Sequence, residues 1–219
     1  MNQPRFGSWA ALLLLAGAGN CLFGQVVYVP NAYEQTISAF VINSDAGILT
    51  ELLPRMTTTG LPTAAAADPH GKFLYVTSAG NTGFNVTVFG INAASGALNT
   101  PSASSTYPVD GDPVAVCVDP SGKLLYVVTQ STIGSARALF ASPQFIGQYD
   151  GIVGFTVDTA TGTLTRMSGT PYATGYAPSA VVVDPSGKFL YVTNQASNNV
   201  SAYTINSSTG VLKIGRAHV

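Results

Sequence analysis

The feature of this 219-residue sequence that most constrains its fold is a unit of about 50 residues that repeats along the chain. One string, Asp-Pro-x-Gly-Lys-x-Leu-Tyr-Val, occurs three times, starting at Asp68, Asp119 and Asp184. A second string, apolar with alternating small polar residues, precedes a glycine turn, and its four copies start at Ile37, Val86, Ile152 and Val200. A period of this length predicts a repeat architecture in which each unit packs on its neighbours.

Each unit predicts four short strands. The apolar run before Asp-Pro does not alternate, which is typical of a buried strand, and Asp-Pro-x-Gly favours a tight turn. Four antiparallel strands in a unit of this length are typical of a β-propeller blade. The sequence therefore predicts an all-β propeller with blades at about 25–56, 57–105, 106–170 and 171–213. Residue 25 aligns with the second strand of the other units, so we expect the first blade to lack its innermost strand, with 15 strands in all.

The repeated unit, with Tyr191-Val-Thr-Asn194 spelling its most distinctive tetrapeptide, resembles the YVTN-repeat and lactonase-family β-propellers, which include 6-phosphogluconolactonase-like proteins. The resemblance covers 25–213 and implies a seven-bladed ring, so we expect the sequence to be a truncated fragment with about four blades. Enzymatic members resemble one another in a Gly-Pro-Arg-His segment that enters an innermost strand, and in a Glu just past the second strand. In this chain, the positions that align with that Arg and His are occupied by Thr63 and Ala64, Val114 and Ala115, and Ser179 and Ala180. The positions that align with the Glu are occupied by Ala32, Ala79, Gln130 and Gln195. The resemblance thus supplies no catalytic set in these blades, and the catalytic residues stay unknown.

The two ends of the chain differ from the repeats. Residues 1–24 contain Arg5 and then an apolar run of about ten residues, which predicts a secretory signal peptide too short to span a bilayer. We therefore expect an extracytoplasmic protein that is periplasmic, secreted or held at the cell surface. Cys21 is an alternative lipid-anchor site, although Asn20 stands where a small residue is expected. Residues 214–219 match nothing in the repeat, and the codons that would encode them resemble a sequencing adapter, so we expect a non-native tail.

Composition excludes several partners. Only 9% of the residues are charged and the formal net charge is −1, which excludes a coiled coil and a nucleic-acid interface that depends on a basic patch. Cys117 lies in an apolar run and is expected in the core. His70 takes the serine position of an Asp-Pro-Ser-Gly turn, and we expect it to serve the turn and not as a general base. No cofactor and no metal are predicted.

Loop geometry predicts where a ligand would bind. In a propeller, the loops between second and third strands and between blades lie on one rim, over the central channel, where ligands usually bind. The acidic residues expected on that rim are Glu34, Asp110, Asp112 and Asp150. About fourteen extra residues between 130 and 149 form either a neutral insertion or a lid, whose candidate contact residues are Arg137, Phe140, Phe145 and Tyr149. The carboxylates could hold a hard cation, but such residues are more often solvated loop charges.

Two functions follow from these observations. The first is an exported binding or scaffold module with an unknown small molecule or surface partner at the channel rim. The alternative is a lactone hydrolase of the 6-phosphogluconolactonase-like family, so whether the protein is an enzyme stays open. Phosphorylated sugar lactones are cytoplasmic, and export argues against them as substrates.

Overall fold

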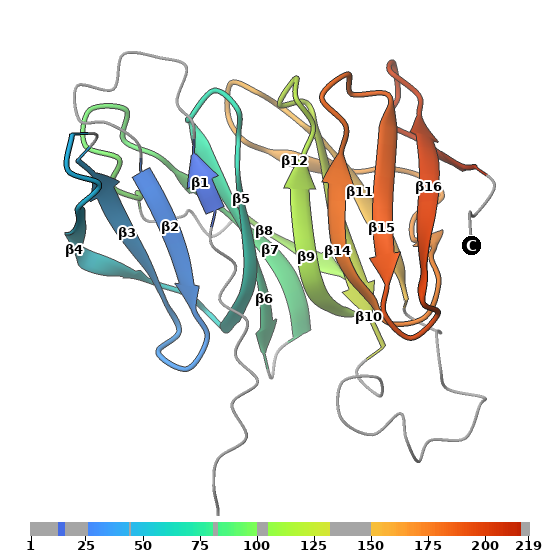
Figure 1. Cartoon of the computed structure of the whole chain (residues 1–219), viewed down its shortest axis with the longest axis horizontal. Helices are drawn as coiled ribbons and strands as arrows, with labels where there is room; N and C mark the ends of the chain where they lie inside the picture. The colour runs from blue at the N-terminus through green and yellow to red at the C-terminus, as the bar shows by residue number, and fades with distance from the viewer. Residues whose placement is uncertain are drawn as a thin grey trace, which may run out of the picture.

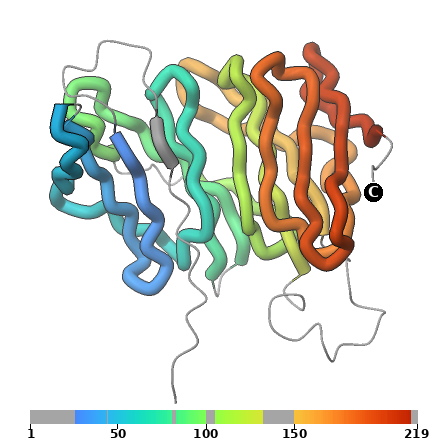
Figure 2. Tube along the Cα trace, viewed as in Figure 1, coloured from blue at the N-terminus to red at the C-terminus, as the bar shows by residue number. Residues whose placement is uncertain are grey.

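The computed structural model describes residues 13–15, 26–43, 45–80, 83–99, 105–131 and 150–215. These residues form four antiparallel sheets that stand side by side like successive blades (Figure 1). The trace passes through the sheets in chain order, from the first blade to the fourth (Figure 2). The predicted all-β, partial propeller is confirmed. Among the described residues, no helix is long and apolar enough to cross a membrane.

Within each sheet the strands follow chain order. Blade 1 consists of β1 (Leu13–Leu15), β2 (Val26–Asn31), β3 (Thr36–Ile42) and β4 (Leu49–Thr57). Blade 2 consists of β5 (Leu61–Ala67), β6 (Phe73–Gly80), β7 (Gly83–Gly90) and β8 (Thr106–Val109). Blade 3 consists of β9 (Asp112–Val118), β10 (Leu124–Gln130), β11 (Gly151–Val157) and β12 (Leu164–Arg166), and β13 (Tyr172–Ala173) also pairs with β11. Blade 4 consists of β14 (Pro178–Val183), β15 (Phe189–Asn194), β16 (Asn199–Ile205) and β17 (Leu212–Ile214).

The expectation that blade 1 lacks its innermost strand applies to a chain without residues 1–24; in the full 219-residue chain, β1 lies within the predicted signal peptide and takes that position. β1 lies antiparallel to β2, with Leu13 opposite Tyr28 and Leu15 opposite Val26. A free strand edge exposes unpaired backbone groups, and the apolar segment supplies them with partners. With β1 and β13 added, the described residues form 17 strands and not 15. The rest of the predicted signal peptide, including Cys21, lies outside the described residues.

The outermost strand is divided in the two middle blades. In blade 2, the residues that follow the turn at Gly96 pair only through the isolated bridge between Ile91 and Leu98. The main outer strand of this blade is β8, which pairs with β7 and lies beyond the expected blade boundary at residue 105. In blade 3, β12 pairs with the second half of β11 and β13 with its start. β17 ends at Ile214, the first residue of the expected tail, and residues 216–219 lie outside the described part.

The hydrophobic core lies between the blades. Successive residues of a strand point to opposite faces, so each second strand contributes to two neighbouring layers. Tyr126 of β10 packs with Leu190 and Val192 of blade 4, whereas Leu125 and Val127 pack with blade 2. A third layer joins blades 1 and 2. Each blade is thus stabilised mainly by the blades on either side of it.

The Asp-Pro-x-Gly turns connect the first and second strands. The Asp119 carboxylate accepts hydrogen bonds from the amides of Ser121 (3.0 Å), Lys123 (2.8 Å) and Leu124 (2.7 Å), and from the Ser121 hydroxyl (2.5 Å). In blade 2, His70 Nδ1 lies 2.9 Å from the buried Asp68 carboxylate and replaces that hydroxyl. His70 therefore serves the turn, as its position in the repeat predicts.

Candidate ligand site at the channel rim

We call the end of the blades that carries the loops from second to third strands the channel rim; it is the lower edge in Figure 1. The connections that lead into the innermost strands β5, β9 and β14 end at the same rim. The Asp-Pro-x-Gly turns lie at the opposite end. Of the predicted site residues, Glu34, Asp110, Asp112 and Asp150 are described, whereas Arg137, Phe140, Phe145 and Tyr149 lie outside the described residues.

Glu34 belongs to a network of ion pairs in blade 1. Arg55 pairs with Glu34 and also donates from Nε to Glu51 Oε1 at 2.7 Å. The hydrogen bond from Arg55, helped by one from the Ser38 hydroxyl at 2.9 Å, lowers the pKa of Glu51. Because water reaches all three side chains, the pairs contribute little stability, but they do occupy the Glu34 carboxylate.

Asp110 is held in a two-pronged pair with Arg166 of β12. Arg166 Nη1 donates to Asp110 Oδ1 at 3.1 Å, and Nη2 contacts Oδ2. Arg166 Nε donates in addition to the Thr170 hydroxyl at 3.0 Å. This planar pairing suits guanidinium and carboxylate, so Asp110 fixes the connection between blades 2 and 3.

Asp150 ties two rim loops together. Its Oδ1 accepts from the Ser131 amide at 2.8 Å, and its Oδ2 accepts from the Ala177 amide at 3.0 Å. Ala177 has a φ of 49°, a left-handed conformation that is unusual for a residue other than glycine. Asp150 therefore stabilises the connection that leads into β14, and both of its oxygens are used.

Asp112 differs from the other three carboxylates. It is the first residue of β9, an innermost strand, and lies opposite Gln130 in the ladder. Cross-strand partners share a face, and Gln130 Nε2 donates to the Pro178 carbonyl of blade 4 at 2.5 Å, so Asp112 lies on the face toward blade 4. Burial raises the pKa of Asp112. Among the described residues, the Asp112 carboxylate has neither a hydrogen bond nor an ion pair, and in this it differs from the other three.

A β-bulge recurs where the innermost strands of blades 2, 3 and 4 begin, a feature that the sequence did not lead us to predict. In blades 2, 3 and 4 the ladder shifts register at the residue after the strand's proline, namely Thr63, Val114 and Ser179. These are the positions that align with the Arg of the Gly-Pro-Arg-His segment in enzymatic lactonase-like propellers. The Thr63 and Thr77 hydroxyls lie 2.8 Å apart, and those of Ser179 and Thr193 lie 2.9 Å apart. The proline near each strand start is the signal that could have indicated the bulge.

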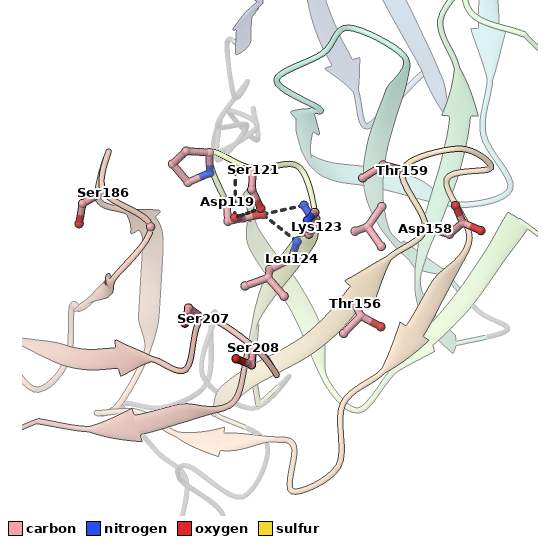
Figure 3. A pocket seen from close by; sticks show the side chains of 13 residues that line it. Asp119, Ser121, Lys123, Leu124, Thr156, Asp158, Thr159, Ser186, Ser207 and Ser208 are labelled. Carbon is pink, nitrogen blue, oxygen red and sulfur yellow. Dashed lines mark hydrogen bonds between the residues drawn. The ribbon is translucent and has the colours of Figure 1, made fainter.

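A groove of about 800 Å³ lies at the turn end of the molecule, between blades 3 and 4. Figure 3 shows the hydroxyl-bearing side chains that line it, among them Ser121, Ser186, Ser207 and Ser208. The Asp119 carboxylate on its wall is occupied by the turn, as the dashed lines show. The groove is therefore separate from the channel rim. Within the described residues, no three His, Cys, Asp or Glu side chains gather as a metal-ligating group.

A comparison against known families agrees with this series of blade-like antiparallel sheets. The family model described as "Lactonase, 7-bladed beta-propeller" matches residues 21–111 and 101–219. The chain belongs to this lactonase family. No curated protein matches the sequence.

Solved structures share the lactonase fold. The chain is similar to a putative 6-phosphogluconolactonase from Bacteroides uniformis, with a TM-score of 0.72 and 22% identity over 96% of this chain and 55% of that one. It is also similar to a periplasmic gluconolactonase from Pseudomonas aeruginosa, with a TM-score of 0.61 and 18% identity over 88% of this chain and 50% of that one. A protein from Lactobacillus plantarum gives a TM-score of 0.63 at 20% identity, over 88% and 53% of the two chains. The chain thus spans about half the length of these relatives.

Proposed function

We propose that this lactonase-family chain is an exported ligand-binding module whose site is the channel rim between blades 3 and 4. The observation that carries the proposal is the state of Asp112, a half-buried carboxylate on an innermost strand without a partner among the described residues. A carboxylate that loses hydration without compensation is costly, and positions of this kind are typical of functional sites. A polar ligand with hydroxyl groups would supply the missing hydrogen-bond donors.

The surroundings of Asp112 support binding in preference to catalysis. Glu34 and Asp110 are paired with arginines, and Asp150 is used by two backbone amides. The bulged positions that would carry a catalytic arginine hold Thr63, Val114 and Ser179. Among the described residues, Asp112 therefore has neither an electrophilic partner nor a second free acid or base for acyl transfer.

Lactone hydrolysis is the second candidate. What favours it is membership of the lactonase family, together with relatives described as a putative 6-phosphogluconolactonase and a periplasmic gluconolactonase. In that case Asp112 would act as a general base on water, because its raised pKa brings it nearer to neutrality. This candidate predicts faster ring opening of a sugar lactone in the presence of the protein.

Thermal shift with a panel of sugar lactones and their hydroxy acids tests the binding proposal. A ligand at 100 times its dissociation constant stabilises a protein by about 2.7 kcal/mol, which corresponds to roughly 5–10 °C for a chain of this size. We expect Asp112→Asn to abolish the shift and Asp110→Asn to retain it. A shift that survives Asp112→Asn would place the ligand elsewhere and contradict the proposal.

Export is tested separately. We expect the chain expressed in a Gram-negative host to be recovered from the periplasmic fraction, and deletion of residues 1–24 to return it to the cytoplasm. Recovery of the full chain in the cytoplasm at its unprocessed mass would contradict export.

A further inference from the structure

The groove at the turn end of the molecule is a second concave site, away from the channel rim. Its lining comes from the two turns of blade 3 and the two turns of blade 4, with the strand ends beside them. Figure 3 shows Asp119 and Lys123 of the first turn of blade 3 among the residues of the other three turns. No described residue outside these two blades lines the groove, so its shape depends on how blade 3 packs against blade 4.

The length of one side chain decides whether the space between successive turns is open. In blade 2, His70 stands at the serine position of the Asp-Pro-x-Gly turn, and its Nδ1 lies 3.0 Å from the position of a Cβ on Gly122 of blade 3. In blade 3, Ser121 takes that position, and the nearest atom to a Cβ on Gly187 of blade 4 is Pro120 Cδ at 3.9 Å. The imidazole thus bridges the two turns between blades 2 and 3, whereas the shorter serine leaves the corresponding space between blades 3 and 4 open.

Hydroxyl groups supply most of the polar lining of the groove. Those of Ser121 and Ser186 donate to the aspartates of their own turns, so they present lone pairs as acceptors. Those of Thr159, Ser207 and Ser208 have no hydrogen-bond partner among the described residues. The lining therefore offers both donors and acceptors, which is what a ligand rich in hydroxyl groups requires.

The charges in the groove argue against an ionic ligand. Lys123 is the one basic residue in the lining, and two carboxylates, Asp119 and Asp158, outweigh it. The hydrogen bond that Asp158 accepts from the Ala160 amide at 2.8 Å lowers the pKa of this carboxyl, which keeps it ionised. The net negative lining disfavours a phosphate or a carboxylate as ligand. Among the described residues no third acidic, His or Cys side chain joins the two aspartates, so a metal ion would lack ligands as well.

We propose that this groove binds a short, uncharged oligosaccharide, at a site separate from the channel rim. The sugar hydroxyls would exchange hydrogen bonds with the three unpartnered hydroxyls, and Lys123 would donate to a further sugar oxygen. The C–H groups of the sugar would contact the apolar part of the lining, which consists of Pro120, Leu124 and Val157. A volume of about 800 Å³ lies within the range of small-molecule sites. Because each hydrogen bond replaces one to water, we expect a dissociation constant of roughly 1 mM.

Proton–nitrogen NMR spectra of the isotopically labelled 219-residue chain test the site through the amides of its turns. Maltotriose, cellotriose and laminaritriose are the uncharged probes, and trigalacturonic acid is the anionic comparison. We expect at least one uncharged probe to shift the amides of Ser186 and Ser208 saturably at millimolar concentrations, and the acid to leave them in place. If none of the three uncharged probes shifts these amides, or if the acid shifts them more, the proposal is overturned. Shifts confined to the rim amides of Ser131 and Ala177 would overturn it too.

Two variants fill the groove from opposite sides. Ser121→His should keep its turn, because His70 serves the same turn beside Asp68 in blade 2, and Ser208→Arg narrows the groove from an exposed position of blade 4. We expect both variants to fold, as circular dichroism would show, and to lose the sugar-dependent shifts. His70→Ser is the matched control, because it makes the reverse exchange outside the groove and should keep those shifts. Shifts that survive in both filled variants would place the sugar elsewhere and contradict the proposal.

Discussion

Removal of one hydroxyl group from the layer between blades 3 and 4 gives the sharpest test of the inter-blade hydrogen bond. Tyr126 is fully buried, and its hydroxyl donates to the Gly210 carbonyl at 2.7 Å across 84 positions in the sequence. In Tyr126→Phe this bond is lost and the buried carbonyl keeps no equivalent donor. The loss of a hydrogen bond that leaves a buried partner unsatisfied costs about 1–3 kcal/mol. For a chain of this size a loss of about 2 kcal/mol lowers the melting temperature by roughly 4–8 °C.

The repeat supplies two controls in which the chemical change is identical. The Tyr75 hydroxyl is buried and has no hydrogen-bond partner among the described residues, so Tyr75→Phe should leave the free energy of unfolding unchanged or raise it by up to about 1 kcal/mol. Tyr191 is exposed, and Tyr191→Phe should change it by less than about 0.5 kcal/mol. Urea unfolding followed by circular dichroism at one fixed protein concentration measures all three. Equal losses for Tyr126→Phe and Tyr75→Phe would refute the reasoning.

Three further predictions concern single side chains. Burial raises the pKa of Asp112 above its ordinary value of 3.8, so the folded state loses stability as the pH rises from 3.8 through the raised pKa. We therefore expect Asp112→Asn to be more stable than the wild type at pH 7 and equally stable at pH 3. Urea unfolding at the two pH values measures the difference. Asp150→Ala removes two charge-assisted hydrogen bonds and should lower the free energy of unfolding by about 2–4 kcal/mol, whereas a loss below 0.5 kcal/mol would show that the two rim loops hold without it. Desolvation raises the pKa of the half-buried Cys117 thiol to about 12, so in a Cys21→Ser background iodoacetamide should modify Cys117 at pH 8 far more slowly in the folded protein than in urea, and equal labelling rates would contradict the raised pKa.

The repeat made the blade architecture predictable, because its strands bury residues in alternation and its turns need particular residues. Asp119 shows this most clearly: the same Asp-Pro-x-Gly-Lys string that predicts a turn places four donors around one carboxylate. The divided outer strands were less predictable. Ile91 and Leu98 make only one bridge, and β8 begins at Thr106, because the outermost position has just one neighbour and its pairing depends on long-range geometry.

The position of the four rim carboxylates could be predicted from the sequence, but their hydrogen-bonding partners could not; that a ligand binds there stays a prediction. The sequence places Glu34, Asp110, Asp112 and Asp150 at one rim, but it does not say which carboxylates are already paired. Arg166 reaches Asp110 across 56 positions, and Asp150 reaches the Ala177 amide across 27. Such contacts depend on how neighbouring blades pack, so only the structure distinguishes Asp112 from the other three.

The rate of ring opening of glucono-1,5-lactone, followed by proton NMR with and without the 219-residue chain, tests the binding role most directly. We predict equal rates, because the bulged positions of these blades hold threonine, valine and serine and Asp112 has no catalytic partner among the described residues. Ring opening that is faster with the protein, lost in Asp112→Asn and kept in Asp110→Asn would contradict the binding role and establish lactone hydrolysis in its place.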